Sequence, residues 1–143
     1  MEQHLGDLLY QANKELISVV NRQLAGMNMG YSQLQTLLTM VRLGDGNEID
    51  QEVLAEIMQV DKSNVSRNLS KMQREGFLEI IPSEKDGRKK RVCMTQKGKD
   101  AIKPLVGILG GITSKMTAKI SEDEQKAMMK YLSQMIQNLE EIK

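Results

Sequence analysis

Basic side chains gather in one part of this chain, and their spacing gives the first indication of its chemistry. The segment 62–91 holds nine Lys and Arg residues against four Asp and Glu residues, so it carries +5. Because the formal charge of all 143 residues is +1, the remainder carries −4. A local positive surface on an otherwise acidic body suits a polyanionic partner, since phosphate neutralisation depends on local charge. The segment is therefore a candidate nucleic-acid contact.

The first half of this segment predicts a helix with two different faces. Val65, Leu69 and Met72 recur at helical spacing and predict one buried side. Asp61 is a candidate N-cap, and Gly76 is a candidate left-handed stop. The other side carries small polar and long basic residues, which suit a helix that reads base edges in a major groove. These predicted DNA-binding residues are Ser63, Asn64, Ser66, Arg67, Ser70, Lys71 and Arg74.

The residues of this face have different expected partners. Asn64 and Arg67 suit two-pronged contacts with adenine and guanine, whereas Lys71 and Arg74, further along, suit phosphates. A helix face rich in Ser, Asn, Lys and Arg is also common on ordinary solvent-exposed surfaces, so the helix alone leaves that alternative open.

A basic loop favours the DNA-binding interpretation. The polar stretch 82–90 separates two predicted strands, 77–81 and 91–94, and five basic residues fall between positions 85 and 91. Such a hairpin tip can place an arginine in a narrow minor groove, where the potential is most negative. Arg88 is the candidate for that role, and Asp86 is expected to orient its guanidinium group. The tip adds Asp86, Arg88, Lys89 and Lys90 to the predicted DNA-binding set.

The pattern elsewhere predicts a mainly α-helical fold with a small β-hairpin wing. The helices expected before the reading helix cover about 3–25, 32–41 and 51–58, the second opening on a capping box of Ser32 and Gln35. Those after it cover about 96–118, with a bend near Pro104, and 122–143, opening on a capping box of Ser121 and Glu124. Ser32 and Gln33 are predicted phosphate contacts.

The two terminal helices each carry an apolar stripe whose steps alternate between four and three residues, as in helices that pack against partners. We therefore expect one domain, 1–143, with a winged helix-turn-helix region at 31–95 and a helical dimerisation region at 1–28 and 96–143. The stripes would otherwise cover the core of a single chain. The predicted dimerisation residues are Leu5, Leu9, Ala12, Leu16, Met128, Leu132, Met135, Leu139 and Ile142.

Enzyme chemistry has no support in the residue pattern. His4 is the single histidine, and no catalytic or metal-binding constellation can be built around it. We therefore expect no enzyme activity, metal or cofactor. Cys93, the single cysteine, fits a reducing cytoplasm, and nearby Arg91 is expected to lower its pKa. No stretch approaches the roughly 20 apolar residues of a membrane helix, and no signal peptide is evident.

The run 54–98 resembles the winged-helix domain of the MarR family of transcriptional regulators. The resemblance rests on Leu54-Ala55, Val60-Asp61-Lys62-Ser63-Asn64-Val65-Ser66-Arg67, Arg74-Glu75-Gly76-Phe77-Leu78, Asp86-Gly87-Arg88 and Met94-Thr95-Gln96-Lys97-Gly98. It implies base reading by the helix that begins at Asp61, and a minor-groove role for Arg88. Two departures stand out: Gly87 replaces a frequent second arginine, and Ile80-Ile81 replace frequent basic residues.

The resemblance also implies regulation. It implies a homodimer on double-stranded DNA, most often a repressor on a pseudo-palindromic operator. It also implies a small-molecule pocket between the winged-helix region and the dimer helices, which often takes anionic aromatic compounds. Two alternatives remain open from the sequence: a winged-helix module that binds an acidic protein, and a regulator that responds to oxidation of Cys93.

Overall fold

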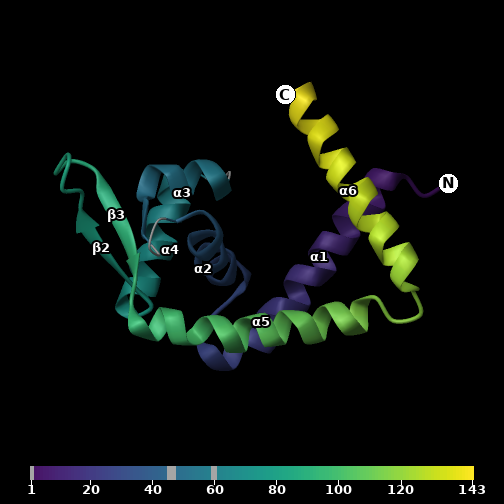
Figure 1. The fold of residues 1–143 in the computed structure, drawn as a ribbon, viewed down its shortest axis with the longest axis horizontal. Coiled ribbons are helices and arrows are strands. Elements are labelled where there is room, and N and C mark those ends of the chain that lie inside the picture. The colour runs from purple at the N-terminus through teal and green to yellow at the C-terminus, as the bar shows by residue number, and fades with distance from the viewer. Residues whose placement is uncertain (1, 45–47, 59–60) are drawn as a thin grey trace. The chain divides into compact units, whose positions relative to one another are not determined.

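The computed structural model describes residues 2–44, 48–58 and 61–143. The chain is mostly helical with one small antiparallel sheet, which confirms the predicted fold class (Figure 1). Its elements are α1 (Leu5–Leu24), the 3₁₀ turn η1 (Ala25–Met27), α2 (Tyr31–Leu43), β1 (Glu48–Asp50), α3 (Gln51–Met58), α4 (Lys62–Arg74), β2 (Leu78–Pro82), β3 (Lys90–Met94), α5 (Gln96–Met116) and α6 (Glu122–Ile142).

The chain divides into two compact units, Met1–Leu109 and Gly110–Lys143. The first unit contains the elements from α1 to the first two thirds of α5, and thus the predicted helix-turn-helix and wing. The second contains the end of α5 and α6. The predicted boundaries at 28, 31 and 95 within the first unit stay predictions.

The sheet has three strands rather than the two that the sequence predicts. β3 lies in the middle, paired antiparallel with β2 on one side and β1 on the other. In β1, Ile49 faces Val92 of β3 and is buried. Arg91 of β3 forms salt bridges with Glu48 at 3.4 Å and with Asp50 at 3.3 Å. These contacts fix β1 across the base of the hairpin.

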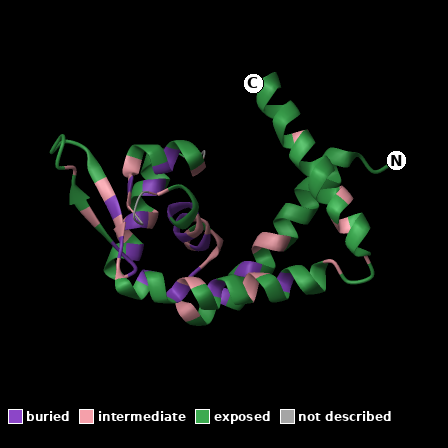
Figure 2. Ribbon diagram, viewed as in Figure 1, coloured by how far each residue is buried: buried purple, intermediate pink, exposed green. Residues whose placement is uncertain are grey.

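The core lies within the winged-helix region, where buried positions cluster on α2, α3 and α4 (Figure 2). Val65, Leu69 and Met72 of α4 are buried as predicted. Leu69 and Met72 are fully inaccessible, and burial of a side chain of that size contributes about 1.5–3 kcal/mol. One face of α4 is therefore committed to the interior.

The start of α2 differs from the prediction. α2 begins at Tyr31 with Gly30 as its N-cap, and the side chain of Gln33 accepts the Gly30 N–H at 2.7 Å. The predicted capping box of Ser32 and Gln35 is therefore wrong, because both residues already lie inside the helix. The Tyr31 N–H donates to Asn21 Oδ1 of α1 at 2.7 Å, so a side chain from the preceding helix satisfies a second free donor.

Close backbone contacts join the end of α4, the wing and the start of α5. Gly76 has φ +86°, which is the predicted left-handed conformation. The N–H of Phe77 donates a hydrogen bond to Met72 O. Thr95 donates its hydroxyl to Gly76 O at 2.6 Å and accepts the Gly98 N–H at 3.1 Å. Its N–H donates to Phe77 O at 3.1 Å. Thr95 is thus the predicted cap of α5 and also the link between the wing and the reading helix.

The later helices follow the sequence pattern closely. α5 continues without interruption through Pro104 and the glycines at 107, 110 and 111, although the sequence suggested a bend there. Ser121 and Glu124 form the predicted capping box at the start of α6, with reciprocal hydrogen bonds of 3.1 and 3.0 Å. The Ser121 N–H and hydroxyl lower the pKa of Glu124, because both stabilise its charged form.

The outer edge of the sheet is partly closed by α4. The side chain of Gln73 accepts the Ile80 N–H of β2 at 2.6 Å. β2 ends at Pro82, which has no N–H to donate. α4 therefore supports the wing through this edge as well as through its buried face.

Replacing Gly98 should test the contact between the wing and α5. An added Cβ would lie 2.3 Å from Phe77 O and 2.6 Å from Met94 Cγ, so the start of α5 would have to move. We expect Gly98→Ala to lower the free energy of unfolding by about 1–3 kcal/mol in urea titrations. Gly107→Ala in the same helix is the control: a Cβ there meets nothing within 4 Å, and the variant should gain about 0.5–1 kcal/mol. Equal stabilities of the two variants would contradict the contact.

Candidate nucleic-acid interface

The reading helix begins where the sequence predicts. Asp61 has extended backbone and accepts the Asn64 N–H at 2.9 Å, so it is the N-cap of α4. Because the buried face of α4 is fixed by packing, the residues between its apolar positions face outward. Of the seven predicted contact residues on α4, six are exposed and Ser70 is half-buried.

Five of these seven residues border one groove. The groove has a volume of about 650 Å³ and runs along the outer face of α4. Apart from the basic residues, the side chains that border the groove are polar and mostly short. The backbone of a binding partner can therefore approach α4 closely. The lining residues are Gln51, Lys62, Ser63, Ser66, Arg67, Ser70 and Arg74. Lys71 is exposed but is not among them.

A second groove places the wing tip beside the same helix. It has a volume of about 210 Å³ and lies between α3, α4 and the hairpin. The lining residues are Gln51, Glu52, Ala55, Lys62, Val65, Arg88, Lys89 and Lys90. Gln51 and Lys62 border both grooves, so Arg67 and Arg88 belong to one continuous face. The sequence-based interpretation depends on this juxtaposition.

The wing tip is shaped by Asp86, but not in the way that the sequence suggests. The Asp86 carboxylate accepts the Arg88 backbone N–H at 3.1 Å, and its carbonyl accepts the Lys89 N–H at 3.0 Å. Within the described residues its contact with Arg88 is to the backbone and not to the guanidinium group, so the predicted orienting contact is wrong. Asp86 forms an Asx-type turn that fixes the tip. The guanidinium of Arg88 is exposed.

Gly87 lies in this turn without needing to be glycine. Its φ is outside the left-handed range, and an added Cβ would meet no atom within 4 Å. The backbone of the tip thus accepts a side chain at the position where the resemblance implies a frequent arginine.

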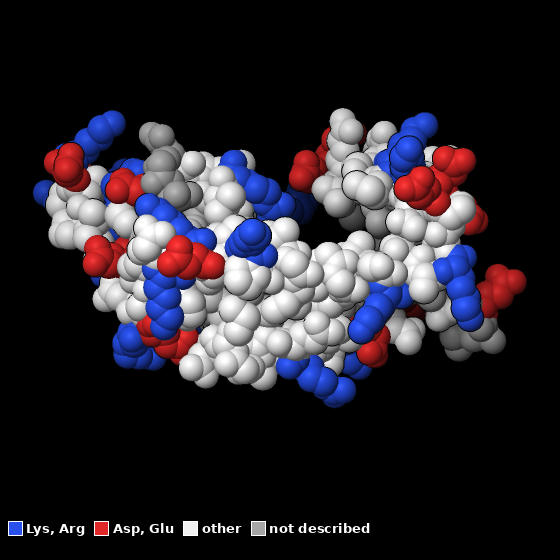
Figure 3. All heavy atoms as spheres, turned by 60° about the horizontal axis from the view of Figure 1, so that its bottom comes forward, with Lys and Arg blue, Asp and Glu red and all other residues white. Residues whose placement is uncertain are grey.

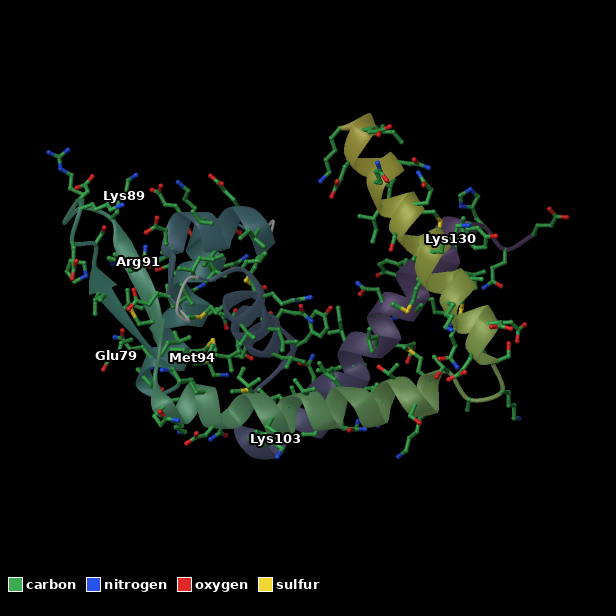
Figure 4. All side chains as sticks on the ribbon, viewed as in Figure 1. Glu79, Lys89, Arg91, Met94, Lys103 and Lys130 are labelled. Atoms are coloured by element: carbon green, nitrogen blue, oxygen red, sulfur yellow. The ribbon has the colours of Figure 1, made fainter. Side chains whose placement is uncertain are left out.

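Arg91 is not part of the exposed tip. Lys90 and Arg91 belong to β3, and Arg91 lies further along the strand than Lys89 (Figure 4). The side chain of Arg91 is half-buried and paired with both carboxylates of β1. The sequence-based prediction counts Arg91 with the basic loop, because it does not include a strand at 48–50. Its positive charge is already neutralised by the protein.

The two predicted phosphate contacts of α2 differ in availability. Ser32 is exposed and borders another groove with Tyr31, Gln35 and Arg42. The Gln33 side chain accepts the Gly30 N–H and donates to Asn68 Oδ1 of α4. Its amide therefore positions the reading helix, and one N–H is left for a phosphate.

Sequence reasoning missed Gln51 and did not assign Lys62 to the site. Lys62 counts in the basic segment, and its place directly after the cap of α4 was a usable signal. No sequence signal identifies Gln51, because its place in the site depends on the packing of α3 between α4 and the wing.

A family model for the MarR family matches residues 27–89. The chain is 28% identical over 104 residues to an HTH-type transcriptional regulator, YybA, of Bacillus subtilis strain 168, covering 72% of this chain and 69% of that protein. The crystal structure of the MepR–DNA complex of S. aureus superposes with a TM-score of 0.84 at 21% identity, over 96% of this chain and 99% of the other. The chain is therefore similar to the MarR family in sequence and in fold.

A further relative by structure is BpsR of Bordetella bronchiseptica, solved in a study of its regulation by 6-hydroxynicotinic acid. It has a TM-score of 0.80 at 17% identity and covers 93% of both chains. At such identity these structures share the fold with our chain. The proteins and structures to which the chain is similar are described as transcriptional regulators.

Cys93 differs from the sequence expectation. Burial, a hydrogen bond to Glu48 and the charges of Glu48 and Glu79 raise the pKa of the Cys93 thiol, and the opposing effect of Arg91 is smaller. Arg91 acts to lower this pKa as predicted, but the net shift of the pKa is upward, because β1 brings Glu48 directly opposite Cys93. A thiol of raised pKa is a weak nucleophile at neutral pH.

The described residues also bear on whether the chain holds a metal site or a membrane-spanning helix. Across residues 2–44, 48–58 and 61–143, no three His, Cys, Asp or Glu side chains are grouped so as to hold a metal ion. None of the described helices combines the length and apolar character needed to cross a membrane.

The raised pKa predicts slow alkylation of Cys93. We expect iodoacetamide to modify the folded protein several-fold more slowly than the denatured chain at about pH 7.5, with a rate that rises toward alkaline pH as the thiolate forms. Mass spectrometry follows this single cysteine directly. Glu48→Gln removes a hydrogen bond and a negative charge, so it should shift the rate profile to lower pH. Equal rates in folded and denatured protein would contradict the proposed environment.

Proposed function

We propose that this protein is a ligand-responsive repressor that binds a pseudo-palindromic operator as a homodimer. The observation that carries the proposal is the continuous face on which the groove of α4 meets the groove under the wing tip. A helix in the major groove and an arginine in the adjacent minor groove would use that face together. The serines allow close approach, and the basic residues at its edges suit phosphates.

The dimer is supported by apolar side chains that the single chain leaves exposed. On α6, Leu132 is 41% and Leu139 57% exposed, and on α1 Leu5 is 57% exposed. Residues 104–114 of α5 contain no charged residue, and Figure 3 shows a broad uncharged surface over this helix. A two-fold interface would cover such faces and place two reading helices on one side of the duplex.

The second predicted set of site residues fits this interface unevenly. Met128, Leu132, Leu139 and Ile142 are exposed, whereas Met135 of α6 and Leu16 of α1 are half-buried in the chain itself. Exposed apolar area of this kind is costly in a monomer, which supports a role in dimerisation.

Similarity to the MarR family and the regulation of the Bordetella protein by 6-hydroxynicotinic acid support a response to a ligand. An anionic aromatic effector needs a basic site with an apolar floor. The groove under the wing tip has three lysines and Arg88 against one acidic residue, Glu52, and a floor of Ala55 and Val65. The groove beside η1 is less suitable, because Glu75 and Asp100 line it with one lysine. An effector would act by changing the affinity for DNA of both half-sites together.

Two other functions carry less support. A winged-helix module for an acidic protein would use the same basic tip, but it gives no reason for the small polar side chains along α4. A thiol switch at Cys93 is disfavoured by its raised pKa. A cytoplasmic location is the natural setting for the proposed regulator.

Selection of bound sequences from a random duplex pool tests the DNA function. We expect a symmetric motif whose half-sites lie about one helical turn, or about 34 Å, apart. Arg88→Ala should weaken binding, with the largest loss for A·T-rich flanks, because their minor groove is narrow. Gly87→Arg is the matched opposite change at an open position, and it should raise affinity and steepen the salt dependence by about one unit of slope. Binding without sequence preference, or without salt dependence, would contradict the proposal.

Sedimentation tests the dimer separately. At micromolar concentration the protein should sediment as twice its 16.1 kDa chain mass. Leu132→Glu should shift the equilibrium toward the monomer by about tenfold or more, because it buries a charge in an apolar contact. Ser133→Glu, on an exposed polar position of the same helix, should leave the dimer intact. A single 16.1 kDa species in the wild-type protein would rule out the dimer.

A further inference from the structure

Asp61 makes two different hydrogen bonds to the same residue. Its Oδ1 accepts the backbone N–H of Asn64 at 2.9 Å, which is the capping contact. Its Oδ2 accepts the side-chain Nδ2 of Asn64 at 2.7 Å, which a cap does not require. The second contact therefore acts on the side chain of Asn64.

The second contact decides which end of the Asn64 amide faces which neighbour. A carboxylate has acceptors only, so the amide nitrogen must lie toward Asp61. The amide oxygen then faces the other way along the helix, where Arg67 Nη2 donates to it. The three residues are spaced by three, which puts them on one exposed face of α4.

We infer that Asp61 is a specificity-determining residue of the DNA interface, acting as a positioning residue through Asn64 on Arg67. It sets the orientation of the Asn64 amide, and the amide oxygen holds the Arg67 guanidinium before DNA arrives. This inference rests on the proposed DNA-reading role of α4. Asp61 itself carries a negative charge, which disfavours a phosphate contact, so its effect is on base preference.

The arrangement matters because an arginine has many rotamers. A guanidinium that is already held loses less freedom when it binds a guanine edge, so discrimination improves. Arg67 lines the groove of α4, whereas Asn64 stands beside it. Each amide atom of Asn64 keeps one further hydrogen-bonding position, so Asn64 can hold Arg67 and still contact DNA.

Asp61→Asn tests the inference with little cost to folding, because asparagine is as good an N-cap as aspartate. Its side-chain oxygen can keep the cap, and its NH₂ group then faces Asn64. The Asn64 amide should then turn over, so that its NH₂ group faces Arg67. Because both groups are donors, the NH₂ group repels the guanidinium. In sequence selection, preference at the base pair read by Arg67 should fall about tenfold, while the other positions are retained.

Arg67→Ala identifies that base pair, and Asp61→Asn combined with Arg67→Ala should cause no further loss there. Asp61→Ser is a second variant that preserves a cap. Its hydroxyl is too short to reach the Asn64 amide, which is released but not inverted, so Asp61→Ser should give a smaller loss than Asp61→Asn at the same base pair. Thermal melting checks that each variant is folded.

A charge-neutral exchange provides the rescue. In the double variant Asp61→Asn with Asn64→Asp, the carboxylate and the amide change places. The carboxylate now at position 64 can accept from both the amide at position 61 and Arg67, so Arg67 is held again. Preference at its base pair should return to within about threefold of the wild type, although a purely structural role for Asp61 gives no reason for recovery.

The outcomes separate this inference from the proposed function. Failure of Arg67→Ala to alter any position of the motif would overturn the DNA-reading role of α4. If Arg67→Ala changes one position but folded Asp61→Asn and Asp61→Ser keep the wild-type preference there, the positioning role alone is wrong. Absence of recovery in the exchange variant also counts against it.

Discussion

Burial of one side of α4 determines which of its residues face the solvent. With about 3.6 residues in each turn, committing Val65, Leu69 and Met72 to the core leaves no choice about which residues face outward. The serines and arginines that border the α4 groove are exposed as a direct result. A polar substitution in the buried set would therefore rotate or loosen the whole surface and not one contact.

The wing, which is the second half of the proposed DNA-binding face, is held to α4 by short-range backbone contacts. Thr95 bonds to Gly76 and Gly98, and the Phe77 carbonyl lies so close to Gly98 that a methyl group has no room. The wing is thus anchored at its base and shaped at its tip by Asp86. Arg91 helps to hold β1 in the sheet through its salt bridges with Glu48 and Asp50. These two carboxylates balance its positive charge.

The parts of this fold that could be predicted from the sequence are those set by local interactions. Asp61 before an apolar repeat, Gly76 after it, and the pair Ser121 and Glu124 all act within one turn of helix, so their types and spacing were enough. β1 was not predicted, because three residues are too few for a recognisable pattern and because they pair with β3, which is distant in the sequence. The same distant pairing explains why Arg91 is not part of the exposed tip and why the net shift of the Cys93 pKa is upward.

Prediction of the candidate site divides in the same way. The residues of α4 and of the wing could be named because each lies on a local element with a clear polar side. Gln51 could not, because it enters the site only when α3 packs beside both. The contact of Asp86 with a backbone N–H, in place of a guanidinium, also depends on the turn that the loop adopts, which its residue types alone do not specify.

The closed edge of β2 bears on how this protein behaves at high concentration. A free strand edge is a template on which other chains can extend a sheet and aggregate. Here the Ile80 N–H is occupied by Gln73, and Pro82 offers no donor. This edge of the hairpin therefore offers few donors with which the hairpin of another molecule could pair.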